Sequence, residues 1–196
     1  MLLSTPNRKP IHLRDVTYRS FLREDGMWDI EGILLDTKGY EQRAVERGQL
    51  PAGTPIHHMG IRLTIDDEFV IHIAETEMVT TPFNECREAR DPVRGLVGLK
   101  IGSGWRKLIN DAMGGDRGCT HLRELLYGMG TAAFQTVGRY RAHERRSAGL
   151  PEPVQLKPLP PLGECLGWSL EGGPVQRHYP QFFQSVPDNA RLVAKE

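Results

Sequence analysis

The chain has 196 residues, of which 39% are hydrophobic and 26% charged, proportions typical of a globular protein of one domain with extensions. Lys plus Arg and Asp plus Glu each number 25, so no basic field predicts nucleic-acid binding. No apolar run approaches the roughly 20 residues that cross a bilayer, and the first residues lack the basic and apolar regions of a signal peptide. We therefore expect a cytoplasmic protein without membrane contact.

The first half of the chain predicts two β-hairpins. Between Arg14 and Lys38 apolar and polar residues alternate, and Glu24-Asp25-Gly26 supplies the backbone freedom that a tight turn needs. A second alternating pair over residues 61–77 turns at Asp66-Asp67-Glu68. The polar stretch from Gly39 to Thr54 is predicted to be a loop. The return strand of the first hairpin presents one apolar face, made of Trp28, Ile30, Gly32 and Leu34.

Two helices are predicted after Pro82. The run IGSGWRKLINDAMGG places apolar residues on one helical face, with Ser103 as the expected N-cap and Gly114-Gly115 as the stop. A longer helix is predicted from about Thr120 to Arg146, with Thr120 capping its start. Its apolar stripe recurs at helical spacing and consists of Leu122, Leu125, Leu126, Met129, Ala133, Val137 and Tyr140.

These elements predict an α+β fold, an antiparallel sheet of two hairpins with helices packed on one face. Residues 1–146 are expected to form a single α+β domain that holds the candidate metal site. Residues 147–196 are expected to be a Pro-rich linker and a tail that packs back on the body through its aromatic residues. Gly172-Gly173 is predicted to turn a short hairpin in that tail.

The potential metal donors stand at the junctions between elements. An odd number of widely separated cysteines argues against a disulfide framework, and each could simply be a small buried hydrophobic residue. Junctions at the same edge of a sheet can converge, and ligand sites are often built there. The donors are His57 and His58 before the second hairpin, Cys86 after it, Cys119 and His121 at the start of the long helix, and Cys165 in the tail.

Cys119 is the most informative of these donors. The exposed N–H groups and the dipole of a helix start stabilise a thiolate, which is the form that binds metal. A thiolate there is equally suited to act as a nucleophile, with His121 or His57 as its base. The spacing of Cys119 and His121 permits a shared ligand, so metal binding and nucleophilic chemistry both stay open.

The order of motifs resembles that of a bacterial family known as a domain of unknown function. The run GTPIHHMGIRLTID is followed by Cys86, by GLKIGSGW and by GCTHLRELL, and the resemblance covers residues from about Arg14 to Tyr140. A cysteine followed by a Pro-containing tail, as at Cys165, is also usual in that family. The resemblance implies a family without implying an activity.

A more distant similarity is to the NifU/IscU-type iron–sulfur scaffold proteins. Those scaffolds hold Zn or a nascent cluster on three cysteines, and the matching positions here are His57, Cys86 and Cys119. Met59 replaces the acidic residue of the scaffolds, and His121 follows the last cysteine where the scaffold histidine precedes it. The similarity implies a NifU/IscU-like core, and the exchange of Cys for His favours stable metal retention over cluster transfer.

We therefore expect a mononuclear Zn or Fe site with mixed Cys and His ligands. The predicted ligands are His57, Cys86 and Cys119, completed by His121, Cys165 or His58. An open coordination position would make the protein a metal-dependent enzyme, whereas four protein ligands would make the metal structural. The alternatives are a metal-free thiol enzyme with Cys119 as nucleophile, and a non-catalytic accessory subunit of a larger enzyme. The expected partners are another protein or a second copy of the chain, with an unknown small-molecule substrate.

Overall fold

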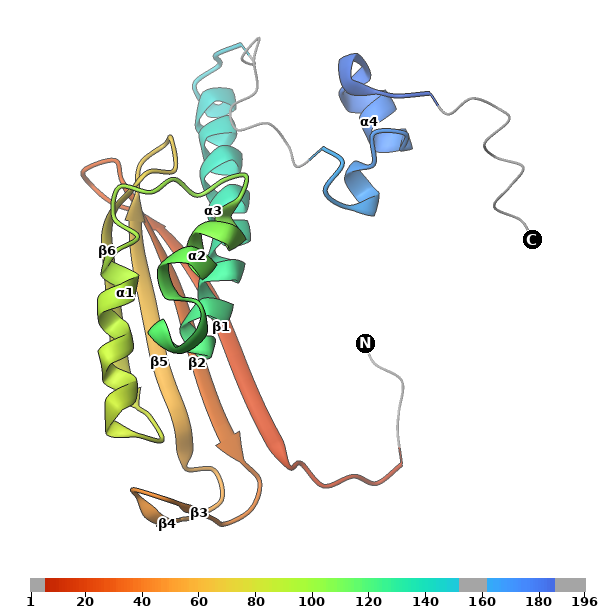
Figure 1. The fold of residues 1–196 in the computed structure, drawn as a ribbon. Helices are drawn as coiled ribbons and strands as arrows, with labels where there is room; N and C mark the ends of the chain where they lie inside the picture. The colour runs from red at the N-terminus through yellow and green to blue at the C-terminus, as the bar shows by residue number, and fades with distance from the viewer. Residues whose placement is uncertain (1–5, 152–161, 186–196) are drawn as a thin grey trace. The chain divides into compact units, whose positions relative to one another are not determined.

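The computed structural model describes residues 6–151 and 162–185, and the chain divides into two compact units, Met1–Arg141 and Ala142–Glu196. The first unit contains a four-stranded antiparallel sheet with helices on one of its faces (Figure 1). The predicted α+β class is therefore confirmed. In the described part of the chain, no helix is long and apolar enough to span a membrane.

The sheet consists of the two predicted hairpins, joined in the order β1-β2-β5-β6. Its strands are β1 (His12–Leu22), β2 (Trp28–Lys38), β5 (Pro55–Ile65) and β6 (Ile71–Thr80). Strand β5 begins earlier than the alternation of IRLTID suggests, so His57 and His58 lie inside a strand and not before it. The predicted loop also contains a small antiparallel ribbon, β3 (Gln42–Ala44) and β4 (Gly48–Leu50). Gly48 has a φ of 71°, a conformation that glycine adopts easily, and it closes the short turn of this ribbon.

The helices follow the sheet in chain order. They are η1 (Asn84–Ala89), α1 (Arg90–Arg94), α2 (Trp105–Met113), η2 (Gly115–Arg117) and α3 (Thr120–Ser147). The bodies of α2 and α3 match the prediction, but both predicted N-caps are wrong. Gly104 precedes α2 with a φ of 81°, and the Cys119 carbonyl accepts the first hydrogen bond of α3, from Arg123 N at 3.1 Å. Cys119 is therefore the residue at the cap position of the long helix.

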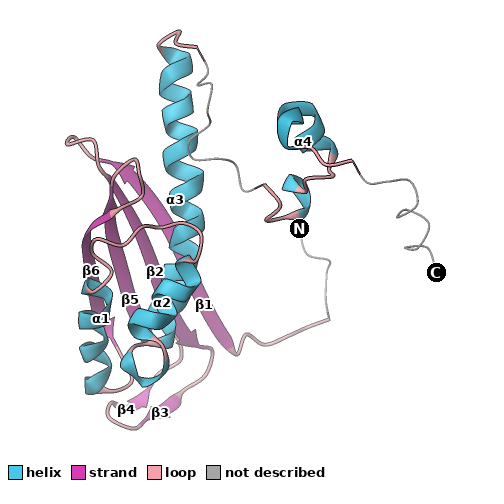
Figure 2. Cartoon of the chain, turned by 45° about the horizontal axis from the view of Figure 1, so that its top comes forward, coloured by secondary structure: helices cyan, strands magenta, loops and turns pink. Residues whose placement is uncertain are grey.

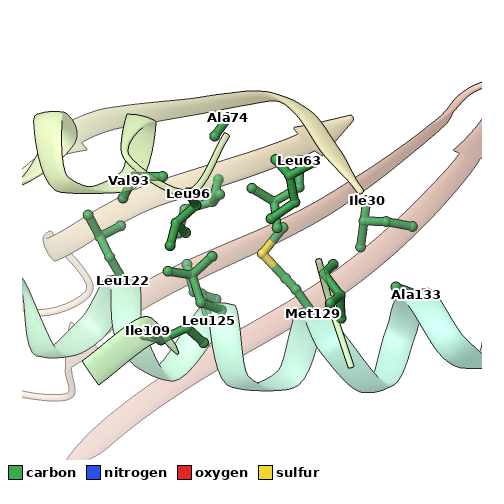
Figure 3. Close-up of a cluster of buried hydrophobic side chains, with 14 of the residues drawn as sticks. Ile30, Leu63, Ala74, Val93, Leu96, Ile109, Leu122, Leu125, Met129 and Ala133 are labelled. Atoms are coloured by element: carbon green, nitrogen blue, oxygen red, sulfur yellow. The ribbon is translucent and has the colours of Figure 1, made fainter. Parts of the chain in front are cut away.

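The core lies between the sheet and the three α-helices of the first unit, which cover the same sheet face (Figure 2). The alternating residues predicted to share one face of β2 include Trp28, Ile30 and Leu34, all of which are at most 1% exposed. The apolar stripe of α3 packs on this face, and Figure 3 shows Leu122, Leu125, Met129 and Ala133 pointing into the cluster. Each of the leucine and methionine side chains stabilises the fold by roughly 1.5–3 kcal/mol when fully buried.

Close packing between α2 and α3 depends on a glycine. Trp105 begins α2, and its indole Nε1 donates a hydrogen bond to the Leu126 carbonyl of α3 at 2.8 Å. A Cβ on Gly130 would lie 2.7 Å from Trp105 Cδ1, closer than real Cβ atoms approach a neighbour. Gly130 therefore allows the indole to reach the α3 backbone, which holds α3 in place over the sheet.

The second unit contains η3 (Leu166–Trp168), α4 (Gly173–His178) and η4 (Pro180–Phe182). The hairpin predicted at Gly172-Gly173 is wrong, because Pro174 fits the first turn of a helix and α4 begins there instead. The rings of Trp168 and Tyr179 lie 5.5 Å apart within this unit. Residues 152–161 of the predicted linker lie outside the described residues, and packing of the tail on the body stays a prediction.

Replacing Gly130 by alanine should lower the free energy of unfolding by about 1–3 kcal/mol, because the added Cβ overpacks against Trp105. Urea denaturation followed by tryptophan fluorescence measures this change. The matched control is Thr131→Ala, an exposed site on the same helix where alanine should be neutral or slightly stabilising. Equal midpoints for Gly130→Ala and the control would contradict the packing described.

Candidate functional site

A row of polar side chains crosses three strands at one end of the sheet. Strand pairing places Arg14 of β1 opposite Asp36 of β2, and Asp36 opposite His57 of β5. Since side chains alternate between faces, all three lie on the side that the helices cover, in line with Leu34 and Ile30. Asp36 is only 2% exposed. The apolar face of β2 thus ends in a buried carboxylate.

Both oxygens of the Asp36 carboxylate accept hydrogen bonds. Arg14 donates from Nε to Oδ1 and from Nη2 to Oδ2, each at 2.8 Å. His12 Nε2 lies 3.0 Å from Oδ1, and His57 Nδ1 lies 3.0 Å from Oδ2. Because an ionised carboxylate only accepts, each of these two ring nitrogens carries a proton. The carboxylate offers about four acceptor positions, and these contacts use them.

The start of α3 brings three further side chains to this row. The rings of His121 and His57 lie 3.9 Å apart with a tilt of 36°, and His121 Nε2 is 3.9 Å from Asp36 Oδ2. On the other side of the same imidazole, Cys119 Sγ is 3.7 Å from His121 Nδ1. Glu124 accepts a hydrogen bond from Arg14 Nη1 at 2.9 Å. The helix start and the sheet edge therefore share one polar cluster.

Burial and neighbouring charges change the protonation of this cluster. Burial by itself raises the pKa of Asp36, but the hydrogen bonds from Arg14 and His12 outweigh it and lower that pKa from 3.8 to about 2. Burial lowers the pKa of His57, against the opposing pull of Asp36. Burial, together with the charges of His57 and Arg14, also lowers the pKa of His121. Both imidazoles are therefore neutral at pH 7, the form that binds a metal ion or accepts a proton.

Fewer potential metal ligands come together in the structure than the sequence predicted. Among the described residues, Asp36, His57 and His121 are the group of three or more donors whose ligand atoms lie within 4.8 Å of one another. Cys119 lies outside this group and contacts one of its members, with its Sγ 3.7 Å from His121 Nδ1. The cluster thus contains three of the five predicted site residues.

The other predicted donors lie elsewhere. Cys86 is in η1, partly buried against the core and outside the group of converging donors, so its role as a ligand stays a prediction. Cys165 is exposed and belongs to the second unit. His58 follows His57 in β5, and its side chain points to the opposite face of the sheet.

Sequence reasoning missed Asp36, Arg14 and His12. The signal for Asp36 was present, because it continues the spacing of two set by the apolar residues of β2. A carboxylate at a position where that pattern requires burial predicts a partner cation or a site. Arg14 and His12 have the same spacing in β1, but their pairing with Asp36 depends on the register of the hairpin.

Replacing Asp36 by asparagine should lower the free energy of unfolding by about 2 kcal/mol at pH 7, since each unit of pKa shift corresponds to about 1.4 kcal/mol. The pKa of Asp36 is lower in the folded state than in the unfolded state. Its stabilisation is therefore present above about pH 4 and is lost as the pH falls towards about 2. Urea midpoints at pH 7 and pH 3 measure this dependence.

The difference between wild type and Asp36→Asn should thus shrink at pH 3. The control is Asp116→Asn, an exposed carboxylate in η2, which should behave as wild type at both pH values. A difference between wild type and Asp36→Asn that is the same at both pH values would mean that the carboxylate contributes no ionised hydrogen bonds.

Comparison with known protein families agrees with the prediction that the chain belongs to a family of unknown function. The family described as "Protein of unknown function (DUF2889)" matches residues 12–135, which include the whole sheet and all the residues of the polar cluster. No curated protein and no solved structure matches the chain, so the NifU/IscU-like core stays a prediction. Because the match extends over more than half of the chain, the protein belongs to this family of unknown function.

Proposed function

We propose that the protein binds one transition-metal ion, Zn or Fe, between the edge of the sheet and the start of α3. His57 and His121 supply imidazole ligands and Cys119 supplies a thiolate, a nitrogen and sulfur set that both metals accept. The observation that supports this proposal is the approach of donor atoms of His57 and His121 to within 4.8 Å of each other beside Asp36, with Cys119 Sγ 3.7 Å from His121 Nδ1.

Asp36 acts in this proposal by orienting a ligand. Its oxygens are already taken by Arg14, His12 and His57, and the Arg14 guanidinium cannot lose its proton to make room for an ion. The carboxylate instead fixes the proton of His57 on Nδ1, which leaves Nε2 with a free lone pair. A carboxylate that holds the second nitrogen of a metal-bound histidine is a recurring feature of metal sites.

Cys119 is suited to be the thiolate ligand by position and distance. A sulfur and a nitrogen bound to one ion at about 2.3 Å and 2.0 Å lie between about 3 and 4 Å apart. The Sγ of Cys119 and the Nδ1 of His121 are 3.7 Å apart. The N-terminal end of α3 also stabilises the negative charge of a thiolate. Three protein ligands leave one position for water or a substrate, which is the pattern of catalytic zinc sites.

The charges around the cluster favour a cation. Asp36 and Glu124 carry two negative charges against the single positive charge of Arg14, and the lowered pKa values keep both imidazoles neutral. A thiolate at Cys119 would add one more negative charge. Metal binding therefore neutralises a cluster that is otherwise net negative.

Protein purified from cells given ample metal should contain about one equivalent of Zn or Fe. The variants His57→Ala and His121→Ala should each lower the metal content below about a tenth of an equivalent, because each removes one ligand. Elemental analysis measures the content. The matched control is His72→Ala, since His72 is an exposed residue of β6 that also pairs with a carboxylate, Asp66, at 2.7 Å. Metal retained by both site variants would mean that the ligands are misassigned.

The variant Asp36→Asn tests whether Asp36 orients a metal ligand or binds the metal ion itself. Loss of an orienting carboxylate weakens metal affinity by about 10- to 100-fold without abolishing binding. A competition titration against a chelator, run at a pH where the variant is shown to be folded, measures this change. An unchanged affinity would remove the orienting role.

A second candidate function is thiol chemistry without a metal. One observation favours it: the imidazole of His121 lies between Cys119 and Asp36. Cys119 Sγ is 3.7 Å from Nδ1 on one side of the ring, and Asp36 Oδ2 is 3.9 Å from Nε2 on the other side. In this arrangement His121 accepts the thiol proton and Asp36 stabilises the resulting imidazolium, as in nucleophilic Cys-His-Asp sites. The thiolate would then displace a leaving group from an electrophilic carbon of the substrate, and the proton held by His121 would pass to that leaving group.

Alkylation with iodoacetamide separates the two functions. If Cys119 is a metal ligand, it should react at least about tenfold faster after chelation than before, because the metal occupies its lone pair. If it is a free nucleophile, chelation should change nothing, and His121→Ala should slow its reaction at pH 7. Mass spectrometry of peptides reports Cys119 separately, and exposed Cys165 is the internal control whose rate neither treatment should change.

A further inference from the structure

Strand β1 is an edge of the sheet in the described part of the first unit. Among those residues it pairs with β2 alone, in unbroken register over its whole length, and all of its residues except Ser20 are exposed. The opposite edge is different, because β6 is bonded at its start to the segment that follows α1, with Ile71 N donating to the Leu99 carbonyl at 2.9 Å. In β1 no proline or bulge interrupts the free N–H and C=O groups. Such an edge is a template for another strand.

The outward face of β1 is complementary to itself. If two copies of β1 pair antiparallel about a twofold axis at Thr17, Leu13 of one copy faces Phe21 of the other, and Asp15 faces Arg19. Leu13 is 55% exposed and Phe21 48%, so the pairing would remove two apolar side chains per copy from water. Asp15 and Arg19 would form one opposite-charge pair on each side of the axis.

Neighbouring registers lack this complementarity. An axis at Val16 would place Leu13 opposite Arg19, and an axis at Tyr18 would place Asp15 opposite Phe21. Both put an apolar side chain against a charge. Only the axis at Thr17 matches charge with charge and apolar with apolar on the outward face.

The helix-covered face of β1 fits the same axis. Val16 and Tyr18, 43% and 37% exposed, would face each other across it as an aliphatic–aromatic pair. A shallow groove of about 660 Å³ lies on this side, lined by Tyr18 and Ser20 of β1 and by Gly128 and Ala132 of α3. The Tyr18 phenol packs over Gly128, where an added Cβ would collide with it, and the groove lies beside this contact along the small residue Ala132.

We propose that the protein forms a homodimer in which two β1 strands pair antiparallel about Thr17, so that the two four-stranded sheets become one continuous sheet. The occupant of the edge is a second copy because the sequence of the strand is complementary to its own reverse. The twofold axis closes the assembly, since each edge is used once. This pairing does not depend on whether the polar cluster binds metal.

Charge reversal tests the register in solution. Light scattering after gel filtration should give a mass twice the 22.1 kDa of the chain. Asp15→Arg should weaken association by about tenfold or more, because two like-charge pairs replace two opposite-charge pairs. The double variant Asp15→Arg with Arg19→Asp should restore the dimer. The control is Asp91→Arg, an exposed position in α1 where a charge reversal should leave the mass unchanged.

Disulfide trapping gives a second and independent readout. In a Cys165→Ser background, Thr17→Cys should cross-link rapidly with copper phenanthroline, because the two copies of residue 17 face each other across the axis. Arg19→Cys is the matched control and should not cross-link rapidly, since residue 19 faces residue 15 of the other copy. A monomer at all concentrations overturns the proposal, as does a dimer in which Arg19→Cys cross-links as fast as Thr17→Cys.

Discussion

The buried carboxylate of Asp36 is the interaction on which the polar cluster depends. Removing an ionised carboxylate from water is costly, and only the guanidinium of Arg14 and the ring donors of His12 and His57 offset that cost. These donors come from the strands on either side of Asp36. The carboxylate therefore fixes the position of β1 and β5 relative to β2 at the end of the sheet where α3 begins, and thereby the place where His121 meets His57.

The position of α3 is fixed at two points along its length. At its start, Arg14 bonds Glu124 while also holding Asp36, so the helix is tied to the strand row by charge. Further along, Gly130 allows Trp105 to reach the backbone of α3, so the helix is held by close packing. A helix fixed in this way holds Cys119 and His121 at a constant place over the sheet edge, which any site with short ligand distances requires.

Much of the fold could be predicted from periodicity, and little of the site could. Alternation identified β1, β2 and the second hairpin, because one face of each strand is apolar. Helical spacing identified α2 and α3 for the same reason. The short η1 and α1 were missed because five or six residues carry too little pattern to separate a helical turn from a loop, and the N-cap of α2 was misplaced because Gly104 turns the chain without a side-chain cap.

The candidate site needed tertiary information. Cys119 was correctly placed at the start of the long helix, whereas His57 lies inside β5 and not before it. The meeting of His57 with His121 depends on how α3 crosses the sheet, which local sequence does not specify. Asp36 was missed for another reason: its spacing predicts burial, but burial argues against a charge at that position. A charged residue that keeps the spacing of an apolar face is therefore informative because it violates the pattern.

The placement of Arg14 and His12 on β1 has a consequence for the dynamics of the protein. In a single copy of the chain this edge strand is held by hydrogen bonds on one side only, so it opens with a smaller free energy than the central strands of the sheet. Pairing with a second copy would remove that difference. When β1 frays, Asp36 loses its guanidinium partner and a histidine together, while β2, β5 and the apolar core stay folded. In a single copy, local opening of this outer strand is then enough to dismantle the polar cluster without global unfolding.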